Sequence, residues 1–361
     1  MGFFKFLDRN HFSCTNCGKC CQSGWNVAIR PSDVVKIEAS VAFKTRHKAG
    51  FTPIVLDEGQ HLAGKNSNGG CTFFTHNGCE IHRELGSSSK PGICQVYPFQ
   101  MAVTPDGIYV SLAFSCPAAV AGFGLASESY EQELTTLFRE PLAEATYEYL
   151  RTADTPIEWM DYCQLEKQML AELSLTLDDP VSTLLQWACR VIHPQATSEE
   201  LDSLYDLAFN LLPLFATSSL SAIENRESNE ARQEFQERLI QAEGVRSEHL
   251  GCELPAFTLC RPQDTITREA VSRYIRQSLE GKRLLSGPTL ATRLLLLGCG
   301  VALVLYLNQA LTKQIDDGRF SFAALEKAFE VVEFEMITHG DCMDDLYREY
   351  ESVLVKSARA L

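Results

Sequence analysis

Basic residues and long apolar stretches are scarce in this sequence. The 361 residues include 32 Lys and Arg against 47 Asp and Glu, a formal net charge of −15. Because an acidic surface repels phosphate backbones, we expect no nucleic-acid partner. The longest apolar run, LLLLGCGVALVLYL at 294–307, has 14 residues. A bilayer span needs ~20 residues, so this run predicts a buried helix, and we expect no membrane partner.

The start of the chain lacks the features of an export signal. MGFFKFLDRN is apolar but short, is interrupted by Lys5 and has no small-residue cleavage site. We therefore expect a cytoplasmic protein, in which thiols stay reduced and disulfides are rare.

The negative charge is concentrated in the later part of the chain. Residues 1–120 hold 11 basic and 8 acidic residues, a balance of +3, which leaves −18 for residues 121–361. Such a surface would suit a basic protein substrate, although a net charge of one sign also serves solubility alone.

The sequence changes in character near residue 125. Before it, Gly, Asn, Ser and Pro interrupt short apolar runs, as in a loop-rich domain. After it, apolar residues recur at spacings of three and four with charged residues between them, which predicts helices. The predicted fold is therefore mainly α. A cysteine-rich metal-binding domain with little regular structure and a β-hairpin (1–125) precedes an α-helical domain (126–361).

Three local features are predicted within these domains. Two apolar-rich runs flank Pro-Asp-Gly in 99–114, which predicts the hairpin. Pro31-Ser32-Asp33 predicts the start of a helix with Ser32 or Asp33 as its N-cap. Residues 244–265 contain two prolines and predict a long loop between helices, and no second β-rich region is expected.

Cysteine is abundant in the first domain. Eight of the 14 cysteines lie in the first 116 residues, four of them in FSCTNCGKCCQSGW at 12–25. A C-x2-C step lets two thiolates of one turn reach the same metal ion or cluster, and thiolate sets hold zinc or iron–sulfur clusters. Reduced thiols that pack as small apolar groups are the alternative. The eight candidate metal ligands are Cys14, Cys17, Cys20, Cys21, Cys71, Cys79, Cys94 and Cys116.

The spacing leaves the grouping of these ligands open. Cys14, Cys17 and Cys20 match the opening of a bacterial ferredoxin motif, but no fourth cysteine follows at the usual spacing of three. Cys116, which precedes Pro117, could complete the set through the fold. Cys21 adjoins Cys20, and neighbouring side chains point in different directions. It could therefore serve a second centre, act as a redox thiol or pack in the core.

Histidines and the later cysteines have simpler interpretations. His76 and His82 flank Cys79 and could join a mixed Cys/His zinc site, although both lie in polar turns. The remaining six cysteines are scattered singly, and we expect them to pack in the core: Cys163, Cys189, Cys252, Cys260, Cys299 and Cys342.

The ordered set C-x2-C-x2-CC-x2-GW, CTFF…GCEIHRELG, C-x2-YPF and SCP resembles the flagellin lysine-N-methylase family. That family belongs to a broader group of cysteine-cluster proteins described as zinc- or iron-chelating. The resemblance covers roughly residues 12–118. The matching residues are Cys14, Cys17, Cys20, Cys21, Gly24, Trp25, Cys71, Phe74, Cys79, Ile81, His82, Leu85, Gly86, Cys94, Tyr97, Pro98, Ser115, Cys116 and Pro117.

The resemblance implies an enzyme that transfers a methyl group from S-adenosylmethionine to lysine side chains of a flagellin-like protein and contains a [4Fe–4S] cluster, with zinc as the alternative. The attacking amine must be neutral, so a nearby group has to take its proton. Tyr97 is the candidate for this catalytic role, and aromatic packing is the alternative for it. No adenosylmethionine pocket is evident, because Gly298-Cys299-Gly300 follows an apolar run without any βα alternation and better fits helix packing.

Two functions of other classes stay open on the sequence alone. One is a non-enzymatic metal-binding or electron-transfer protein. The other is a zinc-stabilised interaction module whose helical part binds a partner.

Overall fold

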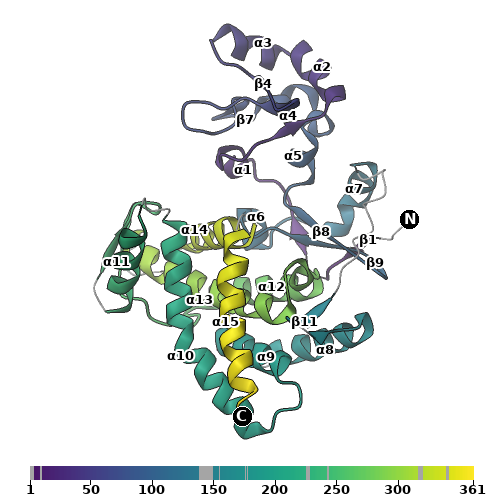
Figure 1. Cartoon of the computed structure of the whole chain (residues 1–361). Helices are drawn as coiled ribbons and strands as arrows, with labels where there is room; N and C mark the ends of the chain where they lie inside the picture. The colour runs from purple at the N-terminus through teal and green to yellow at the C-terminus, as the bar shows by residue number, and fades with distance from the viewer. Residues whose placement is uncertain are drawn as a thin grey trace. The chain divides into compact units, whose positions relative to one another are not determined.

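The computed structural model describes residues 4–8, 10–137, 149–153, 155–174, 176, 178–224, 228–241, 244–315, 320–338 and 341–361. Small sheets lie within residues 4–130, a largely helical part follows, and 59% of the chain is helical, which confirms the predicted fold class. Backbone contacts divide the chain into two compact units (Figure 1). The first contains Asp8–Gln100 and Gly122–Leu142, and the second contains Gly2–Leu7, Met101–Ala121 and Ala143–Leu361. A domain boundary at 125/126 stays a prediction, because contact units need not fold independently.

The first unit is built from short elements. Its sheets are β3 (Ala28–Ile29), β5 (Gln60–Ala63) and β4 (Ile54–Asp57) in that order, β6 (Phe74–Thr75) with β7 (Gly78–Cys79), and β10 (Leu125–Ala126) with β2 (His11–Phe12). Its helices are α1 (Lys19–Gln22), α2 (Pro31–Ala39), α3 (Val41–Lys48), α4 (Glu80–Leu85), α5 (Gly92–Val96) and α7 (Glu131–Leu137), with 3₁₀ turns η1 (Ser87–Ser89) and η2 (Ser127–Tyr130).

A small apolar core holds the first unit together. Its buried centre includes Ile29, Ile37, Phe73 and Ile81, and three cysteines pack against it from the side. Two residues of α2, Val34 and Ile37, face this core because they lie three apart, on one side of the helix. The core is therefore the platform against which the cysteines are placed.

The start of α2 differs from the expectation of a Ser32 or Asp33 cap. Arg30 is the N-cap, and Pro31 takes the first helical position, where its missing N–H costs nothing. Asp33 lies in the first turn and accepts a hydrogen bond from Arg30 Nε at 3.0 Å. Because proline favours the first helical position, the helix begins at Pro31, before either predicted cap residue.

In the second unit, the predicted hairpin is confirmed. Strands β8 (Phe99–Thr104) and β9 (Gly107–Leu112) pair around Pro105-Asp106, and β1 (Phe4–Phe6) joins β9 in parallel, giving the order β1-β9-β8. Tyr109 lies opposite Lys5 in this register.

Helices make up most of the second unit. They are α6 (Pro117–Ala121), α8 (Trp159–Leu173), α9 (Pro180–Ile192), α10 (Ser198–Ile223), α11 (Asn229–Ile240), α12 (Thr265–Glu280), α13 (Leu290–Ile315), α14 (Phe322–Val331) and α15 (Asp341–Ala358), with the 3₁₀ turn η3 (Arg283–Ser286) and the π-helical turn η4 (Val332–Thr338). Figure 1 shows α10 and α15 running side by side.

Helix α13 is the centre of the helical core and contains the apolar run of 294–307. It packs against α9, α10, α14 and α15. A Cβ on Gly298 would lie 3.6 Å from Leu184 Cβ of α9, an ordinary van der Waals distance, so the two helices pack closely at this point. Two helices, α10 and α13, are long and apolar enough to cross a membrane by length and composition. The apolar window of α13 is 94% buried inside the protein, which is typical of a core helix.

Short strands occur where a loop was expected in the helical part. Strands β13 (Val245–Ser247) and β14 (Cys252–Leu254) form an antiparallel pair, and β11 (Leu150–Thr152) pairs with β12 (Thr155–Pro156). The segment 244–265, expected to be a loop, thus contains a short hairpin, and neither of the two strand pairs amounts to a second β-rich region. Strands of two or three residues are too short to show the alternation by which strands are identified.

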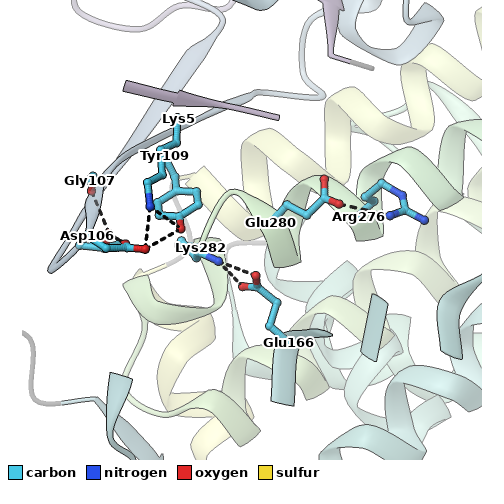
Figure 2. Close-up of polar contacts among 9 residues, drawn as sticks. Lys5, Asp106, Gly107, Tyr109, Glu166, Arg276, Glu280 and Lys282 are labelled. Atoms are coloured by element: carbon cyan, nitrogen blue, oxygen red, sulfur yellow. Dashed lines mark hydrogen bonds and ion pairs between the residues drawn. The ribbon is translucent and has the colours of Figure 1, made fainter. Parts of the chain in front are cut away.

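The second unit also buries charged groups in pairs. Lys282 is 3% exposed, and its Nζ lies 2.5 and 2.6 Å from the two carboxylate oxygens of Glu166 (Figure 2). The Nζ also lies 4.3 Å from the centre of the Tyr109 ring, within reach of a cation–π interaction. Glu333, on η4, pairs with Arg283 and accepts a hydrogen bond from Tyr274 at 2.9 Å. Glu166 and Glu333 thus each have a basic side chain as a partner, whereas the buried Glu351 accepts hydrogen bonds from the hydroxyl groups of Thr289 and Thr292.

Candidate metal centre

One cavity in the first unit collects most of the predicted ligands. It has a volume of about 70 Å³. Six of the eight candidate cysteines line it: Cys14, Cys20, Cys21, Cys71, Cys79 and Cys94. They come from three segments, 14–21, 71–79 and the helix that carries Cys94, so the fold, and not local spacing alone, brings them to one place.

The first cysteine loop turns tightly at Gly18. This residue has φ +75°, a left-handed conformation that favours glycine, and Cys21 N donates to its carbonyl at 2.9 Å. A Cβ at Gly18 would lie 1.8 Å from Phe74 Cζ, so the Phe74 ring lies where only a glycine leaves room. Gly18 therefore shapes the loop and admits one wall of the cavity.

Backbone hydrogen bonds tie the second cysteine segment to the first. Cys71 N donates to Cys21 O at 2.7 Å, and the backbone of Cys71 forms an isolated antiparallel β-bridge with that of Lys65. Cys79 ends β7, directly opposite Phe74 in the β6–β7 pair. These contacts place Cys71 and Cys79 beside the Cys20–Cys21 pair.

The third segment supplies Cys94 from the short helix α5. Its backbone N–H donates to Pro91 O at 2.9 Å, and Pro91 itself lines the cavity. Cys94 packs against the apolar core together with Cys71 and Cys79.

Two aromatic residues close the cavity wall. Trp25 Nε1 donates to Cys20 O at 2.6 Å. The ring of Tyr97 meets Trp25 edge-on, with the ring centres 5.0 Å apart and an interplanar angle of 87°. Both residues line the cavity, and the contact fits the packing role considered for Tyr97.

Burial and mutual contact perturb the thiols strongly. A hydrogen bond from Cys21 lowers the pKa of Cys20 to about 7 and raises the pKa of Cys21 well above its usual range. Burial raises the pKa of Cys71 to about 11 and that of Cys94 to about 12. Neighbouring sulfurs add to both shifts. The sulfur atoms thus lie close enough for their charges to interact.

Cys17 and Cys116 do not line the cavity. Cys17 is exposed, and Cys116 is buried at the start of α6 in the second unit. His82 lines the cavity, whereas His76 does not. None of the described cysteines forms a disulfide.

The later cysteines mostly behave as core residues. Cys189, Cys252, Cys260 and Cys299 are buried, as predicted, and Cys163 is half-buried. The side chain of Cys342 lies outside the described residues.

The donor set fits a thiophilic metal better than a hard cation. The cavity has six thiols and no Asp or Glu, whereas calcium and magnesium require oxygen ligands. Among the described residues, no three Cys, His, Asp or Glu side chains stand in an arrangement that could hold an ion as placed. Metal binding therefore requires the thiols to turn toward a common point. Thiolates are ligands that suit zinc or iron.

Lys90 and Phe74 line the cavity, and neither was singled out as functional from the sequence. Lys90 stands 4 residues before Cys94 in a polar turn, SSSKPG, and nothing in that composition distinguishes it from a solvated loop. Phe74 was noted only as part of the family resemblance. Its role beside Gly18 depends on a tertiary contact that no spacing predicts.

Comparison with known proteins addresses the same region. Residues 13–117 match a family model, CxxCxxCC, described as "Putative zinc- or iron-chelating domain". An uncharacterised protein of the archaeon Methanocaldococcus jannaschii is 28% identical over 97 residues, which are 27% of this chain and 32% of that protein. The chain thus spans about a third of the length of the curated relative that it matches. No solved structure matches. The segment 13–117 is thus similar to cysteine-cluster domains described as zinc- or iron-chelating, and all six thiols that line the cavity lie within it.

Proposed function

We propose that the cavity of the first unit binds a thiolate-ligated metal centre, a [4Fe–4S] cluster in the first place and zinc as the alternative. The observation that carries this proposal is the convergence of six cysteines on one cavity that holds no carboxylate. A [4Fe–4S] cluster and a tetrahedral zinc each use four thiolates, so the six thiols suffice for either centre. The cluster stands first because the family resemblance implies it.

The four ligands that we propose are Cys20, Cys71, Cys79 and Cys94. Cys21 adjoins Cys20 in the chain and hydrogen-bonds to it, so Cys20 is the acceptor of the two. The other three pack together against the apolar core. Cys14 lines the cavity from an exposed position and could replace one of them.

Metal analysis of the anaerobically purified protein tests the proposal. Brown protein with about four iron and four sulfide per chain would support the cluster. Colourless protein with one or two zinc would support the zinc alternative, and protein free of both metals would exclude the proposal. Cys71→Ser should remove most of the metal, whereas Cys189→Ser, a buried thiol of the second unit, should leave the content unchanged.

Two further variants test whether the metal ligands are the cavity cysteines alone or all cysteines of the sequence motif. Cys17→Ser and Cys116→Ser remove cysteines of the motif that do not line the cavity. Both should keep their metal. Loss of metal from either one would show that the ligand set extends beyond the cavity residues.

We further propose that the protein is a protein-lysine N-methyltransferase that uses S-adenosylmethionine and acts on a flagellin-like protein in the cytoplasm. The support is the family resemblance over residues 12–118, together with the position of Tyr97 on the cavity wall. When bound, the metal centre would supply fixed charge and hold the thiol segments in place. Tyr97, in its phenolate form, would accept the proton of the lysine ammonium and become a phenol, and the neutral amine could then attack the methyl group.

Methyl transfer is tested with the metal-loaded chain, radiolabelled S-adenosylmethionine and purified flagellin. Labelled flagellin is the expected result, and Tyr97→Phe should lower the rate about 10²-fold because general base catalysis contributes at that scale. A protein that neither transfers the label nor shifts its thermal midpoint in excess S-adenosylmethionine is no methyltransferase. An electron-transfer protein is then favoured if the cluster shows a reversible potential, and an interaction module if the metal is zinc.

A further inference from the structure

Lys90 is the one lysine, and with His82 one of two basic residues, in the wall of the cysteine cavity. The other lining residues are cysteines, apolar and aromatic residues, glycines, one asparagine and His82, and none is acidic. Lys90 is thus the lysine that lines the cavity together with six thiols.

The backbone around Lys90 is held by specific hydrogen bonds. Gln95 Nε2 donates to Lys90 O at 2.5 Å and to Ser88 O at 3.2 Å. Lys90 N donates to Ser87 O at 3.1 Å, and Pro91, which follows, lines the cavity. The half-buried lysine is therefore anchored beside the α5 helix that carries Cys94.

Its charge lies close to the thiols. Lys90 lines the same cavity as Cys20 and Cys94, and it lies four residues before Cys94 in the chain. An ammonium in this wall attracts the negative charge that thiolate ligands carry.

We infer that Lys90 is the counter-charge of the metal centre, a positioning residue that stabilises an all-thiolate centre of net negative charge and thereby favours metals bound by thiolates alone. The inference rests on the proposed function. Four thiolates around one divalent ion leave a net charge of roughly −2. A buried negative charge without a partner is costly, and partners around a metal site influence its affinity strongly.

Metal retention by the purified full-length chain tests the inference, with Zn²⁺ as the probe. Zn²⁺ is removed by titration with a chromophoric chelator, and the variants are Lys90→Gln, Lys90→Met and Lys90→Arg. We expect the first two to bind Zn²⁺ about 10-fold more weakly, as other partners of metal sites do, and the arginine variant to recover most of the affinity. Lys48→Gln is the control, because it removes the same charge from an exposed position of the first unit that does not line the cavity.

The outcomes separate this inference from the metal proposal. Equal Zn²⁺ retention in wild type and in both neutral variants would overturn the role of Lys90 and leave the metal site intact. A wild-type chain that binds neither Zn²⁺ nor iron would overturn both. If Lys90→Gln fails to fold by circular dichroism, Lys90→Met, which keeps the aliphatic stem, decides the question. If the protein carries a cluster, the neutral variants should also lower its reduction potential, which a merely structural lysine would not change in this direction.

Discussion

At the scale of single residues, Gly18 is the position where sequence and fold constrain one another most closely. Its positive φ would strain any other residue, and its missing Cβ leaves room for the Phe74 ring. The loop that carries Cys20 and Cys21 therefore depends on a residue with no chemistry of its own.

Replacing Gly18 by alanine should destabilise the protein by more than the backbone strain alone. A left-handed alanine costs about 1–2 kcal/mol, and the overlap with Phe74 should add about 1–3 kcal/mol by overpacking. Gly24→Ala is the matched control, because Gly24 has nearly the same φ, +77°, and no atom lies within 4 Å of its added Cβ. Urea unfolding measures both. Equal losses in the two variants would show that the Phe74 contact has no energetic weight.

The ligands also show the limit of prediction at this scale. Cysteine spacing identified eight thiols, and the structure brings six of them to one cavity. Cys17 matched the ferredoxin-like spacing as well as Cys14 did, yet it is exposed and off the cavity. Spacing reports which thiols share a turn, but the direction of each side chain depends on the φ and ψ values of the turn and on the walls around it.

At the scale of elements, long helices and the hairpin were predictable, whereas very short elements were not. The apolar spacing of α9 and α15 and the Pro-Asp-Gly turn between β8 and β9 are local signals, so local sequence suffices for them. Strands β13 and β14 have three residues each and depend on partners for their existence. The pairing of β1 with β9 joins residues about a hundred positions apart, beyond any periodicity.

The Lys282–Glu166 pair is an element-scale contact that the sequence did not reveal. It joins Glu166 of α8 to Lys282, which follows α12, and Lys282 adopts φ +60°, a conformation uncommon outside glycine. The pair is buried on both sides, with 3% and 9% side-chain exposure. Such a pair fixes how the two helices meet.

Lys282→Met should destabilise the protein by about 3–5 kcal/mol, because it leaves the buried Glu166 carboxylate without its partner. The double variant Lys282→Met with Glu166→Leu should recover most of this loss, since no buried charge then remains. Denaturant unfolding of wild type, Lys282→Met, Glu166→Leu and the double variant gives the coupling energy. A single variant as stable as wild type would mean that the pair contributes nothing to stability.

At the scale of the whole molecule, the two units are stabilised by different means. The second has a large apolar core around α13, which is buried along nearly its full length. The first has short elements and a small core, and the cysteines form part of that core. Small domains of this kind commonly need a metal or disulfides to be stable, and the described cysteines form no disulfide.

Removal of the metal should therefore affect the units unequally. Under anaerobic conditions, a strong chelator should increase hydrogen exchange in residues 12–100, because metal binding contributes to folding free energy. Protection in α9 and α13 should stay the same, since their contacts lie within the helical core. Hydrogen–deuterium exchange with mass spectrometry measures both regions in one sample. An equal loss of protection in α13 would show that the second unit also depends on the metal.

The sequence by itself determined the class of this protein: a cysteine-rich segment, a hairpin, a helical remainder and a thiol set suited to zinc or iron. These features follow from composition, from the spacing of apolar residues and from turn-forming residues, all of which can be recognised within a short stretch of sequence. Only the tertiary structure decided which thiols meet, that Lys90 joins them, and that Glu166 neutralises Lys282. Such contacts join residues far apart in the chain, and their formation depends on the packing of cores that the local sequence does not encode.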